Sequence, residues 1–206
     1  EEAETLAGQV RDAGTEAFLV QGDLATPSEA AEVFQTAVET GGPVDILINS
    51  ASIFPESRWH DAPPEAVHES VDINALSPFE LARAFAEQGR PGAIINFLDT
   101  MVLDNDRAHF AYHLSKRMFF TMTKILAVEL APQVRVNAVA PGLVLPPPDK
   151  DEHYLAERAH TNPLQRYGSA DGIAEAVRFL LRSGFVTGQT IYVDGGRHLR
   201  GVMYGT

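Results

Sequence analysis

The segment VDILINSAS, residues 44–52, is an apolar run that ends in small polar residues. A short apolar run of this kind is typical of a buried strand in a parallel sheet, and its polar end predicts a turn at the carboxyl end of the strand. Ligands of open α/β sheets bind at that end of the strands. The segment therefore predicts both a fold class and the place of a binding site.

Further segments repeat this pattern of an apolar run with a polar or glycine-containing end. They are AFLVQGDL (17–24), GAIINFLD (92–99), VRVNAVAPGLV (134–144) and GQTIYVDGG (188–196). Helical patterns lie around them, over residues 1–13, 28–39, 63–87, 109–130 and 170–182. The alternation of strand and helix predicts an α/β fold with a doubly wound, Rossmann-like parallel sheet, in a single domain that spans residues 1–206.

The segment HFAYHLSKRMFF (109–120) carries the pair of residues that indicates chemistry. Tyr112 and Lys116 are four positions apart, which places them on one face of a helix with Cβ atoms roughly 6 Å apart. The Lys116 ammonium would then favour the phenolate of Tyr112, and such a tyrosine can act as a general acid or base near neutral pH. The alternative is a chance pair on a solvated helix face, so the neighbouring motifs must decide.

Those motifs, in this order and spacing, resemble the short-chain dehydrogenase/reductase family. They are Asn49-Ser50-Ala51-Ser52, Asn74 in VDINALSPF, Tyr112 with Lys116, Pro141-Gly142 in VNAVAPGLV, and Val193-Asp194-Gly195-Gly196. The resemblance implies an NAD(P)H-dependent oxidoreductase with Tyr112, Lys116 and Asn74 in the catalytic group. In this family Lys116 would also anchor the ribose of the cofactor, and Asn74 would hold a water that relays protons from it. The residues alone leave Asn74 as a candidate helix cap.

The same resemblance implies which residues line the cofactor. They are Asp23, Leu24, Asn49, Ser50, Ala51, Tyr112, Lys116, Pro141, Gly142, Leu143 and Val144. Asp23 and Leu24 would border the adenine ring, although the residues alone favour a turn that ends a strand. Pro141-Gly142 is a turn signal in its own right, and its glycine would let the backbone approach the flat carboxamide.

Two departures from the family pattern point to the substrate. Asp99 stands thirteen residues before Tyr112, where the family has serine, and Ser52 stands where it has glycine. With Phe54 and the terminal GGRHLR (195–200), they resemble the pteridine reductases, and especially the bacterial dihydromonapterin/dihydrofolate reductase branch. That resemblance implies that Ser52, Asp99 and Tyr112 contact a pterin and that Phe54 stacks on its ring. The alternatives are an ordinary strand-end aspartate and a packing phenylalanine.

The chemistry of a carboxyl group agrees with this substrate. A serine hydroxyl polarises a carbonyl, whereas a carboxyl group can carry a proton, directly or through water, to a ring nitrogen while an imine bond accepts hydride. We therefore expect NADPH-dependent reduction of a dihydropteridine such as dihydromonapterin, with dihydrofolate or biopterin as further substrates and NADH as an alternative cofactor. The alternatives are a carbonyl reductase acting on a 3-oxoacyl thioester, a sugar or a steroid ketone, and a non-catalytic nucleotide-binding or scaffold protein.

The sequence contains no G-x-x-x-G-x-G loop for the cofactor phosphates. In the sheet order of the family, the first two strands lie between the strands predicted at residues 17–22 and 44–49, which would put these about three strand spacings, or near 14 Å, apart. We therefore expect an amino-terminally incomplete chain that lacks the first two strands. The residue that separates NADP from NAD would lie in that segment.

Composition narrows the class of protein. With 28 acidic against 16 basic residues, the chain is expected to bind neither nucleic acid nor anionic membranes. It has no cysteine for disulfides or thiol catalysis, and no apolar run of the ~20 residues that a membrane span needs. His109 and His113 lack further ligands in register, so no metal site is predicted. The composition is typical of a cytoplasmic enzyme.

Two segments predict features around the site. LPPPDKDEHY (145–154) is a proline-rich, charged loop, and its place after Pro141-Gly142 predicts a substrate lid over about residues 145–165. The helix at 109–130 is apolar almost all round, so a second face must be buried. In the family this helix and the helix over residues 74–87 form the dimer seam of a homotetramer, and burial within a monomer is the alternative.

Overall fold

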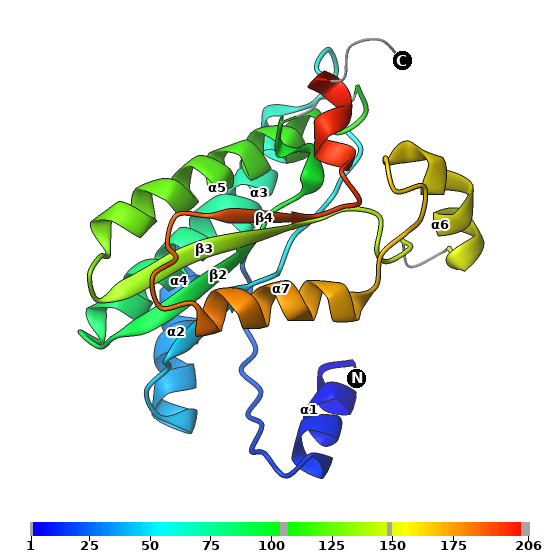
Figure 1. Cartoon of the computed structure of the whole chain (residues 1–206). Helices are drawn as coiled ribbons and strands as arrows, with labels where there is room; N and C mark the ends of the chain where they lie inside the picture. Colours follow the sequence, from blue (N-terminus) through cyan, green and yellow to red (C-terminus); the bar gives the residue numbers. More distant parts are fainter. Residues whose placement is uncertain (1, 104–106, 148–149, 203–206) are drawn as a thin grey trace.

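The computed structural model of this protein describes residues 2–103, 107–147 and 150–202 (Figure 1). Four parallel strands form one sheet in the order of their occurrence along the chain. They are β1 (Ile46–Asn49), β2 (Gly92–Phe97), β3 (Val134–Pro141) and β4 (Thr190–Val193). Each lies within a segment whose apolar run predicted a strand, so these four predictions are confirmed.

Helices cover both faces of this sheet, as a doubly wound fold requires (Figure 1). They are α1 (Glu2–Asp12), α2 (Pro27–Gly41), α3 (Pro64–Val71), α4 (Ser77–Glu87), α5 (Phe110–Glu129), α6 (Glu152–Arg158) and α7 (Ala170–Arg182). In the described part of the chain, no helix is both long and apolar enough to cross a membrane. The predicted α/β class and single-domain Rossmann-like architecture are confirmed.

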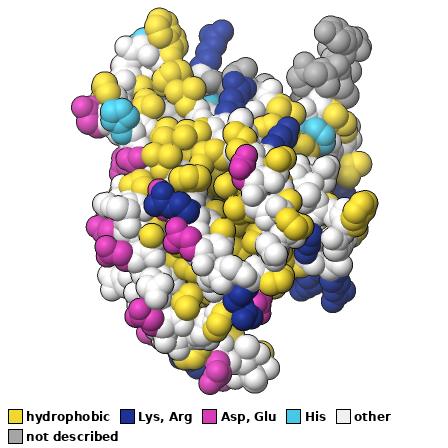
Figure 2. Space-filling model, turned by 90° about the vertical axis from the view of Figure 1, so that its left-hand side faces the viewer, with side chains coloured by type: hydrophobic (Ala, Val, Ile, Leu, Met, Phe, Trp, Pro, Cys, Tyr) yellow, Lys and Arg dark blue, Asp and Glu magenta, His cyan; other side chains and the backbone are white. Residues whose placement is uncertain are grey.

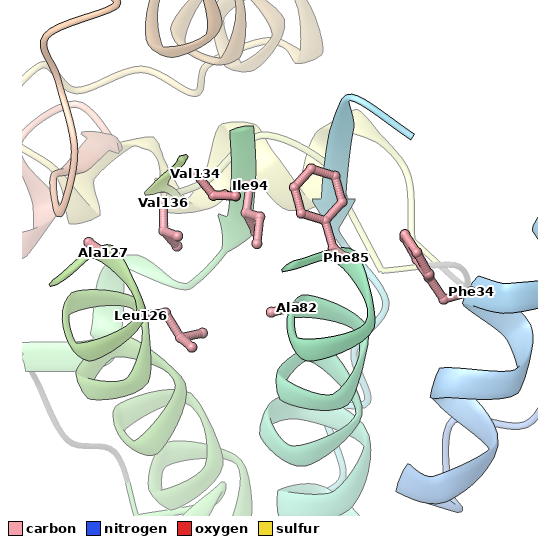
Figure 3. Packing of buried hydrophobic residues seen from close by; sticks show 8 residues of the cluster. All are labelled: Phe34, Ala82, Phe85, Ile94, Leu126, Ala127, Val134 and Val136. Atoms are coloured by element: carbon pink, nitrogen blue, oxygen red, sulfur yellow. The ribbon is translucent and has the colours of Figure 1, made fainter. Parts of the chain in front are cut away.

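The larger core lies between the sheet and the helices α2, α4 and α5 (Figure 3). Ile94 of β2 and Val136 of β3 are fully buried there, because both sides of a central parallel strand are covered. Phe85 of α4 meets Phe34 of α2 edge to face, with ring centroids 6.1 Å apart. A second cluster packs Ile95 and Val139 against α7 on the opposite face. Burial on both faces of β2 and β3 leaves the ends of these central strands open to ligands.

The helix predicted over residues 63–87 is interrupted by a π-helical turn, η1 (Asp72–Leu76), between α3 and α4. Pro78 explains the interruption, because it has no N–H to donate to the carbonyl of Asn74 four residues earlier. The amide of Ser77 instead reaches back five residues to the carbonyl of Asp72. Asn74 therefore lies within a helix rather than at its start, and its interpretation as a helix cap is wrong. π turns of this kind are frequent at functional sites.

The strand predicted at residues 17–24 is wrong for the described structure. These residues form no strand, and Phe18 and Leu19 are about half exposed. A strand needs a neighbouring strand to accept and donate its backbone hydrogen bonds. Among the described residues β1 is paired only with β2, so residues 17–24 have no strand beside them. In the described structure residues 17–22 and β1 are not hydrogen-bonded to each other, and the separation of about 14 Å stays a prediction. The outer edge of β1 exposes Ile46 and Ile48.

One arginine ties the sheet to the end of α7. Arg135 Nη1 of β3 donates to the carbonyl oxygens of Leu180, Ser183 and Val186 at 2.8, 3.1 and 3.3 Å. Its Nη2 donates to the carbonyl of Leu181 at 2.9 Å. The last carbonyls of a helix have no partner within the helix, so the guanidinium both satisfies them and opposes the negative end of the helix dipole.

Replacing Arg135 with methionine keeps much of the side-chain volume and removes these hydrogen bonds. We expect the free energy of unfolding, measured by urea titration, to fall by about 2–4 kcal/mol. Arg182→Met, at an exposed position in the last turn of the same helix, is the control and should change it by less than about 0.5 kcal/mol. Equal effects of the two variants would contradict the capping role of Arg135.

Candidate active site

The predicted catalytic residues meet at the carboxyl ends of the strands. Asp99 follows β2 by two residues, and Tyr112 lies in the first turn of α5. Tyr112 Oη donates a hydrogen bond to Asp99 Oδ2 at 3.0 Å. The other carboxylate oxygen, Oδ1, accepts from the Met101 N–H at 2.6 Å. The thirteen-residue spacing thus becomes a direct contact between an acid and a phenol.

A loop serine, Ser57, fixes the start of α5. The Phe110 N–H donates to the carbonyl of Ser57 at 2.9 Å, and the Ala111 N–H donates to Ser57 Oγ at 3.0 Å. The side chain of His109, at the cap position itself, makes no capping hydrogen bond. Because Ser57 is far away in the sequence, its capping role could not be recognised from local pattern. Its effect is to join the loop after β1 to the helix that carries Tyr112.

The expectation that Lys116 lowers the pKa of Tyr112 is wrong for this structure. Burial raises the pKa of Tyr112 above its ordinary value, and the adjacent carboxylate of Asp99 raises it further. Lys116 Nζ lies over the phenol ring, 5.9 Å from its centroid, and donates to the carbonyl of Phe97 at 3.0 Å. The phenol is therefore held as a proton donor that faces Asp99.

Lys116 itself is buried, with 3% of its surface exposed. Burial lowers the pKa of its ammonium to about 8, although the nearby charge of Asp99 acts in the opposite direction. Its bond to Phe97 uses one of three N–H donors. The side chain is thus a buried cation at neutral pH that can still donate to a ligand.

Asn74 joins three segments of the site by its side chain. Asn74 Oδ1 accepts from Ser52 Oγ at 3.0 Å and from the Ile53 N–H at 2.8 Å. Asn74 Nδ2 donates to the carbonyl of Ile53 at 3.0 Å and to Ser115 Oγ at 2.9 Å. The loop after β1, the π turn and α5 are therefore fixed to one another. Ser52, a predicted substrate contact, is held by this amide.

Phe54, the predicted substrate-stacking residue, lies beside Tyr112. Its ring meets that of Tyr112 edge to face at 4.5 Å, and it is 56% exposed. His109 stacks on it, with ring centroids 3.9 Å apart and planes inclined by 16°. Exposure of a large aromatic ring at the mouth of the site goes against a packing role.

Two polar groups at the end of the sheet fit a nicotinamide nucleotide. Asn49 Nδ2 donates to Asn96 Oδ1 at 2.9 Å, but its own Oδ1 is buried and has no partner in the described structure. Buried acceptors without a partner are rare and need an explanation. This acceptor and the remaining donors of Lys116 suit the amide and hydroxyl groups of such a cofactor. Ser50 and Ala51, which follow Asn49, are small and exposed.

Pro141 is the last residue of β3 and Gly142 follows it. The close approach of Asp194 explains why position 142 is glycine. A Cβ at position 142 would lie 2.6 Å from Asp194 Cα, so no side chain fits. The Gly142 N–H donates to the carbonyl of Val193 at 3.0 Å, which extends the pairing of β3 with β4. Leu143 and Val144 are buried beyond it. Close packing against Asp194 therefore requires Gly142, whatever ligand lies beyond.

Asp23 and Leu24 form the turn that the residues alone favoured. Asp23 Oδ1 accepts from the Ala25 N–H at 2.9 Å, and the carbonyl of Leu24 accepts from Ser77 Oγ at 2.7 Å. Their hydrogen bonds in the described structure do not join the catalytic group. A contact with the adenine ring stays a prediction.

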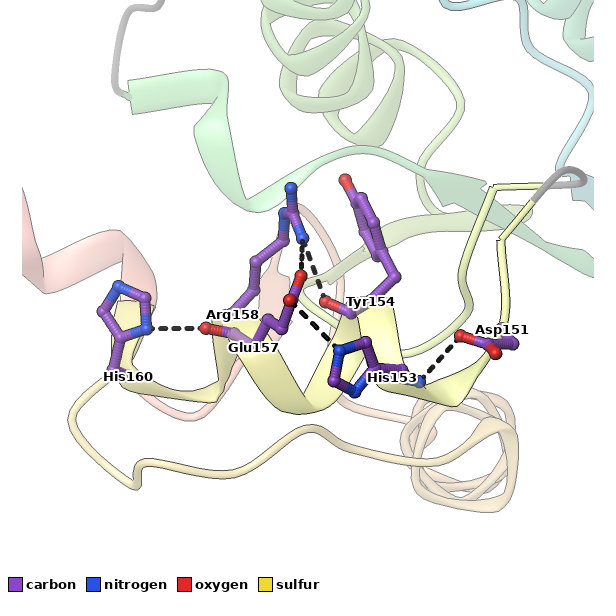
Figure 4. Close-up of polar contacts among 6 residues, drawn as sticks. All are labelled: Asp151, His153, Tyr154, Glu157, Arg158 and His160. Carbon is purple, nitrogen blue, oxygen red and sulfur yellow. Dashed lines mark hydrogen bonds and ion pairs between the residues drawn. The ribbon is translucent and has the colours of Figure 1, made fainter.

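The predicted lid contains α6 and a self-contained set of polar contacts (Figure 4). Asp151 caps the helix by accepting from the His153 N–H at 3.0 Å, and His153 Nε2 lies 3.1 Å from Glu157 Oε1. Leu155 is the one buried side chain of α6. Residues 148–149 of the lid lie outside the described residues. A helix with a single buried anchor is suited to movement, but closure over a substrate stays a prediction.

Comparisons with known proteins show similarity of sequence and of fold over most of the chain. The family model described as enoyl-(acyl carrier protein) reductase matches residues 1–198. The chain is 28% identical to a 3-oxoacyl-[acyl-carrier-protein] reductase of Staphylococcus epidermidis, covering 97% of this chain and 85% of that protein. It is 31% identical to the L-xylulose reductase of Mus musculus, covering 80% and 72%.

A solved structure is similar over the whole chain. It is the FolM alternative dihydrofolate reductase 1 of Brucella canis, complexed with NADP, with a TM-score of 0.89 and 30% sequence identity. The match covers 100% of this chain and 81% of that one.

The low pKa of Lys116 predicts a rise in stability with pH. Between pH 8 and 10 the unfolded chain keeps a proton on this lysine that the folded protein releases, so the free energy of unfolding should rise, by about 2 kcal/mol. Above pH 10 the raised pKa of Tyr112 acts in the opposite direction. Urea titrations at pH 8, 9 and 10 measure the effect. Lys116→Met should abolish the rise, and Lys124→Met, at an exposed position on the same helix, should keep it.

Proposed function

The chain belongs to the short-chain dehydrogenase/reductase family of oxidoreductases, and we propose that it reduces a dihydropterin with NADPH. The observation that carries the proposal is the 3.0 Å hydrogen bond from Tyr112 Oη to Asp99 Oδ2. It places a second proton-carrying group where the family resemblance leads us to expect a serine hydroxyl. Reduction of a C=N bond needs a hydride on carbon and a proton on nitrogen, and a carboxyl group suits the second task.

The proton is managed by the pair of side chains rather than by the tyrosine alone. Burial and Asp99 keep the proton on Tyr112 by raising its pKa. The bond to Asp99 aligns the phenol, so that Tyr112 passes its proton to Asp99 Oδ2 as the substrate takes up hydride. The carboxyl group then protonates the ring nitrogen, and water returns a proton to the tyrosine. A phenol that released its proton to water at neutral pH could not act as the donor. We propose Tyr112 and Asp99 as the catalytic acid pair.

Lys116 and Asn74 complete the catalytic group in different ways. Lys116 is a buried cation at neutral pH with further N–H donors, so it suits the ribose hydroxyls of the cofactor. The side chain of Asn74 fixes the loop that bears Ser52. Its carbonyl lacks the usual helical donor at Pro78, which supports the proposed place for a relay water.

The cofactor contacts are proposed from the residues that fit it. Asn49, Ser50, Ala51, Lys116, Tyr112, Pro141, Gly142, Leu143 and Val144 would hold the nicotinamide half, and Asp23 and Leu24 would border the adenine. NADPH, when bound, supplies the hydride. The FolM structure contains NADP, which supports NADPH over NADH as the cofactor of this chain.

Phe54 and Ser52 are the proposed substrate contacts. The exposed ring of Phe54 beside Tyr112 can stack on a flat heterocycle, and stacking orients the ring without fixing the substituent it carries. Dihydromonapterin is the proposed substrate, with dihydrofolate or biopterin as further ones. The name of the FolM neighbour supports this class.

Carbonyl reduction is the second candidate function. The relatives include a 3-oxoacyl-[acyl-carrier-protein] reductase and an L-xylulose reductase, both named for carbonyl substrates. Tyr112, Lys116 and Asn74 would serve either reaction, so only the residue at position 99 and the ring at position 54 discriminate.

A homotetramer is proposed from the outer face of α5. Leu114, Met118, Ile125 and Val128 are exposed and fall on one side of this helix. Figure 2, in which the left-hand side of Figure 1 faces the viewer, shows hydrophobic side chains gathered in the upper and central part of that face. Phe119 faces the core instead, with 2% exposed. A stripe of four large apolar side chains exposed on one side of a helix favours a protein interface.

The substrate is tested by following NADPH oxidation with dihydromonapterin, dihydrofolate, a 3-oxoacyl thioester and no substrate. We expect pterin turnover, and Asp99→Ser should lower its kcat by roughly 10²-fold because the second proton carrier is lost. The same variant should gain weak reduction of the thioester, since serine supplies the donor that a carbonyl needs. Tyr112→Phe is the inactive control. Turnover of the thioester alone by the unsubstituted protein would establish the second candidate instead.

The assembly is tested by light scattering at micromolar concentration. Met118→Glu places a charge in the stripe on α5 and should yield smaller particles than the unsubstituted protein. Leu6→Glu, at a 61% exposed position on α1, is the matched control and should leave the particle mass unchanged. A monomeric unsubstituted protein would refute the tetramer.

A further inference from the structure

The segment that follows β4 is hydrogen-bonded to the loop that carries Asp99. Asp194 Oδ2 accepts a hydrogen bond from Thr100 Oγ1, and the side chain of Asp194 is only 1% exposed. The same oxygen accepts from the N–H of His198 at 2.7 Å and lies 2.9 Å from His198 Nδ1. Oδ1 accepts from the Gly196 N–H at 2.9 Å. A buried carboxylate is thus surrounded by donors from two distant segments.

The surroundings of Asp194 keep it in place as an anion. Burial alone would raise the pKa of this carboxyl, but hydrogen bonds from Thr100, His198 and Gly196 lower it below its ordinary value. The His198 ring stacks on Tyr192 of β4, with centroids 4.1 Å apart and planes inclined by 20°. The acceptor for Thr100 is therefore anchored to the sheet.

The loop after β2 is held on several sides, and Asp99 is at its centre. The Leu98 N–H donates to the carbonyl of Val139 at 2.9 Å, and the carbonyl of Val102 accepts from Arg117 Nε of α5 at 3.1 Å. Thr100 begins the short 3₁₀ helix η2 (Thr100–Leu103) and is 4% exposed.

The next residue, Met101, contacts both the segment after β4 and the carboxylate of Asp99. Its N–H donates to Asp99 Oδ1 at 2.6 Å, and its sulfur lies 3.8 Å from Arg197 Nη2. The segment after β4 thus contacts both residues that follow Asp99.

We propose that Asp194 is a positioning residue, which sets the place of the Asp99 carboxylate against Tyr112 by holding Thr100. Its role rests on the proposed function in one respect, because the position matters for turnover only if Asp99 takes part. Without the hydrogen bond, η2 loses its attachment to the segment after β4 at Thr100, and the Met101 N–H that orients Asp99 can shift. A misplacement of about 1 Å costs up to 10²-fold in rate.

Turnover in a double-mutant cycle tests this role. Thr100→Val removes the hydroxyl at nearly constant volume and should lower kcat on dihydropterin about tenfold, while Thr100→Ser should restore most of it. In the Asp99→Ser background, the same Thr100→Val change should cost less than about twofold, because the group it positions is gone. The dissociation constant for NADPH should not change in either background. A merely structural role would instead give equal losses in both backgrounds.

A second measurement is independent of the substrate. In protein labelled with ¹³Cγ-aspartate, the Asp99 resonance is assigned by its absence from Asp99→Ser. It should shift in Thr100→Val and stay in place in Thr100→Ser. If Thr100→Val does not fold, His198→Phe keeps a ring to stack on Tyr192, removes one bond to Asp194, and should shift the same resonance.

Either an unchanged kcat in Thr100→Val or an unchanged Asp99 resonance overturns the positioning role. If the unsubstituted protein does not reduce dihydropterin, the proposed function has failed. The resonance of Asp99 then decides the role of Asp194 by itself.

Discussion

The hydrogen bonds of the Asn74 side chain are the interactions on which the rest of the site depends. This side chain makes hydrogen bonds with Ser52, with both backbone groups of Ile53 and with Ser115. These contacts tie the end of β1, the π turn and α5 into one unit. Because Asn74 is 1% exposed, water cannot replace any bond that is lost, and the cost of a missing partner is high. The place of Phe54 and Tyr112 follows from this junction.

Burial acts on both members of the Tyr112 and Lys116 pair, and it disfavours charge on each. It raises the pKa of the phenol and lowers the pKa of the ammonium to about 8. At neutral pH the tyrosine is therefore neutral and the lysine is a cation. The position of Asp99 adds to the effect of burial on the phenol, because its carboxylate accepts a hydrogen bond from Tyr112 while Lys116 donates to the carbonyl of Phe97.

The segment after β4 fixes the position of residues in the candidate site without lining that site itself. Asp194 requires glycine at position 142, because a Cβ there would meet its backbone, and it accepts a hydrogen bond from Thr100, the residue after Asp99. Asp194 therefore packs closely against the turn after β3 and holds the turn after β2 by a side-chain hydrogen bond. Rigid support of this kind is what a proton transfer between oriented groups needs.

The sequence by itself determined the four strands and most of the helices around them, because apolar periodicity is a local property. The resemblance of its motifs to a known family led us to expect Asp99 and Tyr112 in one site. The sequence could not determine whether residues 17–24 form a strand, since a strand depends on a neighbouring strand with which to pair. Only the tertiary structure decided that Asn74 joins the loop after β1 to α5, that Ser57 caps α5 and that the pKa of Tyr112 is raised. Each of these depends on burial or on a contact between residues far apart in the chain, and no local pattern encodes either.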